Sequence, residues 1–169
     1  HSNTFIGYQA AADGGTQAAG TNITTGSNLT NIGFKARASS STATNEITLG
    51  NSSISSLRCQ VQTISSLSDA RDKTNVAPLQ AGLDFVERLD PVSFTWNMRD
   101  GGKIDIEDTG FIAQDLQQVQ QDTGVNIPGL VYDENPEKLE AAYGKLVPVL
   151  VQAIKDLSAK VNELESQIK

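Results

Sequence analysis

The sequence has almost none of the side chains on which common catalytic and metal sites depend. It contains one histidine, His1, and one cysteine, Cys59, among 169 residues. This inventory disfavours histidine-based triads and zinc clusters, and it excludes an internal disulfide framework. The lone Cys59 is compatible with folding in a reducing cytoplasm, and such a residue is more often a small buried apolar side chain than a nucleophile. The sequence therefore predicts no metal site and no cofactor.

Two further shortages exclude classes of partner. No apolar run is long enough to span a bilayer and no signal-peptide pattern is present, so we expect no membrane insertion. The net charge is −7 and the sequence pI is about 4.6, so the chain would repel a phosphate backbone and nucleic acid is not an expected partner. The chain begins inside a repeating pattern, and we expect it to be part of a longer polypeptide.

Residues 3–66 are poor in charge and rich in Gly, Ser, Thr, Asn and Ala. The segments "FIGYQA" at 5–10 and "NIGFKA" at 31–36 repeat each other among short alternating stretches punctuated by Gly and Asn. No stretch is apolar enough to bury a core alone, so we expect short strands that bury side chains by stacking or by winding around identical chains. The alternative is a flexible Gly/Ser linker. Isoleucines argue against a linker, at Ile6, Ile23, Ile32, Ile47, Ile54 and Ile64.

The sequence after Ser68 has the patterns of an ordinary globular domain. Helical spacing predicts a helix from Leu79 to Leu89, and alternation predicts strands at 92–96 and 103–108 around a turn at 100–102. A second helix is predicted after Gly110, and one long helix from about Pro136 onward. The predicted fold class is α+β, with a β-rich first part and a mixed helix and hairpin second part.

The C-terminal helix carries a heptad seam of apolar residues. The a positions are Val147, Ile154, Val161 and Ile168, and the d positions are Leu150, Leu157 and Leu164. Self-association through a coiled coil is favoured, and packing against the protein's own core is the alternative. β-branched residues at a with Leu at d favour two strands, so a trimer would need other contacts to set the number of chains.

The stretch "LSDARDKTN" at 67–75 stands where the two kinds of sequence meet, and two interpretations fit it. In the first it begins a helix, with Ser68 as the N-cap and Asp69 and Asp72 in the first turn. In the second, Ser68 is a nucleophile and Lys73 is its base, because no usable histidine is available.

The second interpretation depends on burial. A lysine has an ordinary pKa of roughly 10.4 and becomes a base near neutral pH only when it is desolvated or lies near another cation. Arg71 is a cation that would help Lys73, whereas Asp69 and Asp72 would oppose it unless they are turned away. Catalysis would then depend on correct folding and assembly.

Several motifs in order resemble known families. The repeats of the first part resemble the shaft and knob repeats of phage tail fibres and, more loosely, trimeric adhesins. "SDARDKTNV" resembles the Ser-Asp-x-Arg-x-Lys-x-Asn start of the C-terminal intramolecular chaperone domain of endosialidase-type phage tailspikes, which is related to self-cleaving domains of phage neck appendages and the myelin regulatory factor. "FVERLDPVSFTWN", "GFIAQDLQQV" and "LVYDENPEKLEAAYGKLVPVLVQAIKDLSAKVNEL" continue the similarity to the end of the chain.

The resemblance implies a division at one peptide bond. Residues 1–67 would be the end of an interwound, β-rich, trimeric fibre shaft, and residues 68–169 a chaperone that trimerises, registers the shaft and cleaves itself off once between Leu67 and Ser68. Ser68 would be the nucleophile and Lys73 the general base, through an ester or a direct base-assisted route. The family motif adds Asp69, Arg71 and Asn75 as supporting residues.

The resemblance also implies partners and a location. The partners would be two further copies in a homotrimer, joined along Leu150, Ile154, Leu157, Val161, Leu164 and Ile168, and the upstream shaft of the same polypeptide. The fibre would be assembled in the bacterial host cytoplasm and end in the virion tail, and the chaperone would be released. Two alternatives stay open. One is a structural, receptor-binding fibre or adhesin tip that is not cleaved, and the other is a Ser–Lys peptidase that acts on other proteins.

Overall fold

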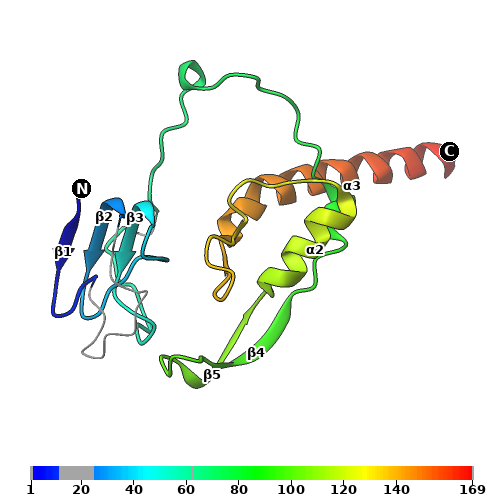
Figure 1. The fold of residues 1–169 in the computed structure, drawn as a ribbon. Helices are drawn as coiled ribbons and strands as arrows, with labels where there is room; N and C mark the ends of the chain where they lie inside the picture. The colour runs from blue at the N-terminus through cyan, green and yellow to red at the C-terminus, as the bar shows by residue number, and fades with distance from the viewer. Residues whose placement is uncertain (1, 12–24, 62, 169) are drawn as a thin grey trace. The chain divides into compact units, whose positions relative to one another are not determined.

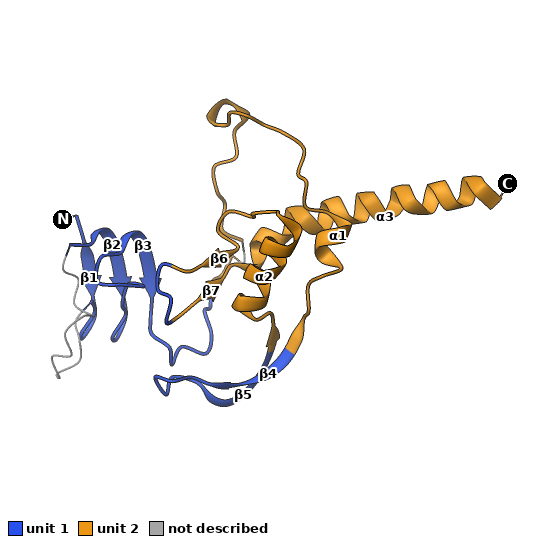
Figure 2. Cartoon of the chain, turned by 45° about the vertical axis from the view of Figure 1, so that its right-hand side comes forward, with its two compact units in different colours: residues 1–58, 93–108, 134–137 blue, residues 59–92, 109–133, 138–169 orange. Residues whose placement is uncertain are grey.

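The computed structural model describes residues 2–11, 25–61 and 63–168. The chain divides into two compact units, one of residues 1–58, 93–108 and 134–137 and one of residues 59–92, 109–133 and 138–169 (Figure 2). Small sheets and a long C-terminal helix make the fold a mixed α+β fold, as predicted. The division by role into residues 1–67 and 68–169 stays a prediction.

The two sequence repeats of the first unit lie on neighbouring parallel strands. Strands β1 (Thr4–Ile6), β2 (Ser27–Ile32) and β3 (Thr44–Leu49) form a parallel sheet in chain order (Figure 1). Ile6 is paired with Ile32, and Ile32 with Leu49. The rings of Tyr8 and Phe34 stack at 6.0 Å with 8° between their planes, so equivalent positions of the two repeats lie over each other.

The glycine of each repeat is required by this stacking. Gly7 and Gly33 have φ angles of 127° and 121°, which residues other than glycine rarely adopt. A Cβ at Gly7 would lie 2.5 Å from the carbonyl oxygen of Gly33. The Ile-Gly pair of each repeat therefore ends the strand and lets two turns of chain approach closely.

Stacking buries one face of the first unit and leaves an apolar ladder on the other. Leu29, at 1% exposed, lies in the small core with Asn31, Ala36 and Ala43. The paired residues Ile6, Ile32 and Leu49 are 56%, 39% and 54% exposed. We call these three residues the aliphatic ladder. Of the other predicted isoleucines, Ile47, Ile54 and Ile64 are exposed, and Ile23 lies outside the described residues.

The predicted hairpin is present. Strands β4 (Val92–Asn97) and β5 (Ile104–Gly110) pair across a loop that is longer than two residues, as expected. Within the first unit, the amide of Met98 donates to the carbonyl of Lys103 at 2.9 Å. The indole Nε1 of Trp96 donates to Asp108 Oδ2 at 3.0 Å, which links the two strands by side chains.

The second unit has one core to which several short elements and one long helix contribute. These are α1 (Leu83–Val86), α2 (Ala113–Thr123), β6 (Val131–Tyr132), β7 (Glu140–Ala141), the 3-10 turn Tyr143–Lys145 and α3 (Leu146–Ile168). The buried core residues are Ala81, Phe85, Leu116, Ile127, Leu130, Leu146 and Val149. Helix α2 lies where it was predicted and ends at Gly124, which has a left-handed conformation.

Two predicted helices are shorter than their patterns suggested. The helix expected from Leu79 to Leu89 is only α1, and the helix expected from about Pro136 begins at Leu146. Glu140–Ala141 pairs with β6 in an antiparallel ladder, so this stretch is a strand. Pro148 lies near the start of α3, where backbone N–H groups have no acceptor within the helix, and it is tolerated there.

Helix α3 holds α1 through one carboxylate. Asp156 Oδ2 accepts from the backbone N–H of Leu83 at 3.0 Å, and Asp156 Oδ1 accepts from Gln152 at 2.8 Å. The backbone donor of Leu83 lowers the pKa of Asp156, with a further contribution from Gln152. Gly82 is buried against this carboxylate, and a Cβ there would overlap Asp156 Oδ2. A side chain at position 82 would therefore displace Asp156 from the backbone N–H of Leu83.

We expect Gly82→Ala to destabilise the second unit by about 1–3 kcal/mol, because the new methyl group displaces Asp156 from Leu83. Chemical denaturation followed by circular dichroism measures this loss. Gly144→Ala is the matched control, since an added Cβ there meets nothing within 4 Å. Equal unfolding free energies for the two variants would contradict the role assigned to Gly82.

Candidate active site

The segment that joins the two kinds of sequence contains one small turn. A 3-10 turn at Ala70–Asp72 is capped by Asp69, whose Oδ1 accepts from the backbone N–H of Arg71 at 2.8 Å. The prediction that Ser68 caps a helix here is therefore wrong. Asp69 is the cap, because an aspartate side chain readily accepts from the amide two residues later and closes a tight turn.

The same aspartate also binds the side chain of Arg71. Arg71 Nε donates to Asp69 Oδ1 at 3.0 Å, and Arg71 Nη2 donates to Asp69 Oδ2 at 2.7 Å. Both carboxylate oxygens are thus occupied by one residue, with the bidentate geometry that guanidinium groups favour. The hydrogen bonds from Arg71 hold the pKa of Asp69 below its usual range, and Asp69 in turn raises the pKa of Arg71.

The turn brings the predicted nucleophile and base together. The backbone N–H of Lys73 donates to the carbonyl of Ala70 at 3.2 Å, and the chain leaves the turn extended at Lys73. Lys73 Nζ then lies 2.6 Å from Ser68 Oγ and 3.1 Å from the carbonyl oxygen of Ser68. Proton transfer between Oγ and Nζ is possible at this first distance.

The remaining predicted site residues adjoin this contact. Leu67 is 80% exposed on the other side of the predicted scissile bond. Asn75 follows Lys73 by two residues with a φ of 54°, a left-handed conformation that Asn tolerates better than most residues. The position of Asn75 therefore indicates a role in the path of the chain. Sequence reasoning missed the pairing of Asp69 with Arg71, although the Asp-x-Arg spacing is a signal for it.

The contact between Ser68 and Lys73 lies in water in the isolated chain. Both residues are exposed, and Asp69 is the one half-buried residue of the turn. Burial is what drives a lysine side chain toward the neutral amine that acts as a base. The geometry of the pair is thus present in one chain, whereas the dry surroundings that the chemistry needs are not.

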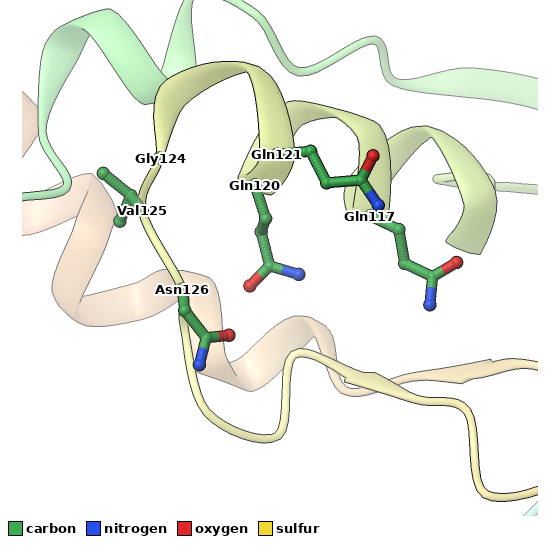
Figure 3. Close-up of a pocket in the computed structure, with 6 residues that line it drawn as sticks. All are labelled: Gln117, Gln120, Gln121, Gly124, Val125 and Asn126. Carbon is green, nitrogen blue, oxygen red and sulfur yellow. The ribbon is translucent and has the colours of Figure 1, made fainter.

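Other features of the described residues do not form a competing site. Cys59 is free and exposed, contrary to the expectation for a lone cysteine. A cavity of about 340 Å³ at the end of α2 is lined by amide and apolar groups and by none of the predicted site residues (Figure 3). Within the described part of the chain, no cluster of His, Cys, Asp or Glu could hold a metal ion, and no helix is long and apolar enough to cross a membrane.

The heptad seam of α3 is separate from the face that packs on the core. Leu146, Val149 and Ala153 of this helix are buried. The seam residues are each at least 45% exposed, at Val147, Leu150, Ile154, Leu157, Val161, Leu164 and Ile168. In the described structure the seam therefore does not serve the protein's own core. Its role in joining identical chains stays a prediction.

Comparisons with known proteins agree with the motifs. Residues 68–125, about a third of the chain, match a peptidase family described as chaperone of endosialidase. The chain is 34% identical over 105 residues to the long tail fiber protein Gp37 of Enterobacteria phage K3, and equally to that of Enterobacteria phage T2. Each match covers 60% of this chain and 8% or 7% of the relative, so the chain spans less than a tenth of their length. No solved structure matches it significantly. The predicted family resemblance is confirmed.

We expect the carboxyl carbon of Asp69 to titrate by NMR below the ordinary range of aspartate, because Arg71 favours the ionised form. The capped turn would then persist as pH falls until it passes this lowered pKa. Arg71→Gln should return the midpoint toward the ordinary value, while Arg58→Gln should not move it. An unchanged Asp69 midpoint in Arg71→Gln would show that the ion pair is absent in solution.

Proposed function

We propose, since residues 68–125 match the chaperone of endosialidase family, that this chain is the end of a phage tail fibre together with its own assembly factor. Residues 68–169 join three chains, set the register of the shaft in residues 1–67, and then leave by a single cut between Leu67 and Ser68. The fibre is assembled in the host cytoplasm and ends in the virion tail. The observation that carries the proposal is the 2.6 Å separation of Ser68 Oγ and Lys73 Nζ, beside that bond and at the first residue of the family match.

The proposed reaction uses only groups of the chain and water. Ser68 Oγ attacks the carbonyl carbon of Leu67, and its proton passes to neutral Lys73 Nζ. The C–N bond breaks as the Ser68 nitrogen takes a proton from the lysine ammonium, which leaves an ester between Leu67 and Ser68 Oγ. Water opens the ester and yields a carboxylate on Leu67 and a free hydroxyl on Ser68. Each chain is cut once, because its substrate is its own backbone.

Assembly supplies the condition that the isolated chain lacks. Lys73 reaches Ser68 through a local turn, but both side chains are exposed. When neighbouring chains cover this segment, desolvation favours the neutral amine and the lysine becomes a base. The cut is then delayed until the chains are in place, which protects the assembly factor from premature loss.

Unburied apolar surface supports a partner of the same kind. The three residues of the aliphatic ladder are 39–56% exposed, and the seven seam residues of α3 are each at least 45% exposed. Apolar side chains that stay in water favour association with another apolar surface. The aliphatic ladders of a second and a third copy have the same spacing and could pack against the ladder of the first. The heptad seams of the three copies match one another in the same way.

A removable clamp suits a shaft of this composition. Polar, repetitive strands specify register weakly, and a slip of one residue moves every side chain to the other face. Holding three chains at one end raises the local concentration of the strands and sets their starting register. Once the clamp is removed, shaft chains that separate have no template on which to wind again. The wound shaft is then stable because its unfolding is slow.

We expect Ser68→Ala to abolish the cut and Lys73→Ala to slow it about 10²–10⁴-fold, because a general base contributes on that scale. Lys73→Arg should be as slow as Lys73→Ala, since arginine keeps the charge but cannot act as the base. Denaturing gels and intact mass of the assembled protein identify a fragment that begins at Ser68.

Ser66→Ala is the matched control, because it removes a nearby serine hydroxyl and leaves the pair intact. Assembled wild-type chains that stay whole would overturn self-cleavage and favour an uncleaved, receptor-binding tip. Turnover of an added peptide by the uncut protein would instead favour a peptidase that acts on other proteins.

We expect Ile154→Asp to break the oligomer, because a carboxylate within the seam would lie unpaired between apolar side chains. Sedimentation velocity of uncut Ser68→Ala protein measures the change from oligomer to monomer. Ala159→Asp adds the same charge to an exposed position of α3 outside the seam and should leave the oligomer intact. Identical sedimentation of both variants and the parent would show that the seam joins nothing.

A further inference from the structure

We propose that Asp69 and Arg71 are a positioning pair for the cut, in which Arg71 keeps the Asp69 carboxylate occupied so that it cannot hold Lys73 as an ammonium ion. This inference rests on the proposed self-cleavage and assigns separate tasks to two residues beside the reacting groups. Asp69 shapes the turn that carries Lys73 to Ser68. Arg71 neutralises the charge that this shaping introduces next to the base.

The geometry of the turn requires a capping side chain at position 69. Its Oδ1 holds the amide of Arg71 at 2.8 Å and so closes the turn from which Lys73 returns to Ser68. Lys73 Nζ makes both of its hydrogen bonds with Ser68, and Ser68 is the residue directly before Asp69. The carboxylate that caps the turn therefore belongs to the residue next to the one that Lys73 Nζ contacts.

Such a carboxylate would oppose catalysis if it were free. A negative charge within about 4–6 Å stabilises the charged form of a lysine and withdraws the base. Arg71 places two guanidinium nitrogens on both oxygens of Asp69, at 3.0 and 2.7 Å. The carboxylate keeps its capping bond to the backbone, while its charge is balanced by a cation that cannot be deprotonated.

The charged surroundings of Lys73 are few and all lie on the same segment. Between Arg58 and Asp84 the chain carries no charged residue other than Asp69, Arg71, Asp72 and Lys73. Residues 63–80 are exposed apart from half-buried Asp69. In the described structure, the side-chain hydrogen bonds of Asp69, Arg71 and Lys73 all stay within residues 68–73. Asp72 is the remaining carboxylate of the turn and is exposed. Removing Arg71 would thus leave two carboxylates beside one lysine.

This arrangement predicts a pH effect that a purely structural turn does not. The cleavage rate of assembled protein is measured from pH 6 to pH 10 for the wild type, Arg71→Gln, Asp69→Asn and the double variant. In Arg71→Gln the freed carboxylate should shift the midpoint of the pH–rate profile upward by about one unit, which lowers the rate about tenfold at a pH below the midpoint.

In the double variant the midpoint should return to that of the wild type, because the opposing charge is gone while asparagine still caps the turn. Arg71→Lys should restore the midpoint in part, since it supplies a cation without the bidentate contact. Equal midpoints for the wild type and Arg71→Gln would overturn the proposal. So would an upward shift that persists in the double variant.

A second readout separates this proposal from self-cleavage itself. Each variant is made in the uncut Ser68→Ala background, and the titration midpoint of the Lys73 side chain is followed by NMR in the assembled protein. The midpoint should rise in Arg71→Gln and fall back in the double variant even if no cut is ever observed. Equal Lys73 midpoints in the parent and in Arg71→Gln would overturn the positioning role, whether or not the assembled protein is cleaved.

Discussion

The structure depends on one constraint, which is that a single copy of this chain leaves two rows of its described apolar side chains exposed. The parallel strands of the first unit bury little more than Leu29 and a few small residues, while the aliphatic ladder stays open. Helix α3 uses one face for its own core and leaves a complete heptad seam in water. Because the hydrophobic effect scales with buried area, both surfaces favour association with matching surfaces.

The turn at Ala70–Asp72 lies in the chain between the parallel strands and helix α3, and it forms without a hydrophobic core. Asp69 closes it through a hydrogen bond to the backbone, and Lys73 lies against Ser68 in a segment that is exposed apart from half-buried Asp69. Local bonds therefore supply the short distance between the proposed nucleophile and the proposed base, whereas burial by partner chains would supply reactivity. In the proposed function, this separation would let one chain carry a preformed pair that reacts only after assembly.

Sequence patterns predicted most elements and placed the ends of two helices wrongly. Helix α2, the hairpin of β4 and β5, and most of α3 follow from periodicity, because each has enough residues to repeat its pattern. The stretch from Pro136 reads as helix but contains β7, whose pairing partner β6 lies several residues upstream. The helix expected from Leu79 begins only after Gly82, where Asp156, far along the chain, accepts from the backbone N–H of Leu83.

By itself the sequence determined the repeats, the seam and the order of Ser68 and Lys73 along the chain, since these are properties of spacing. Only the tertiary structure decided that the repeats stack in parallel register, and that the seam faces away from the core. It also decided that Asp69, not Ser68, caps the turn and that Arg71 covers its carboxylate. The reason is physical: spacing selects which residues share a face, whereas competing hydrogen-bond partners and close contacts are chosen only when the chain is folded.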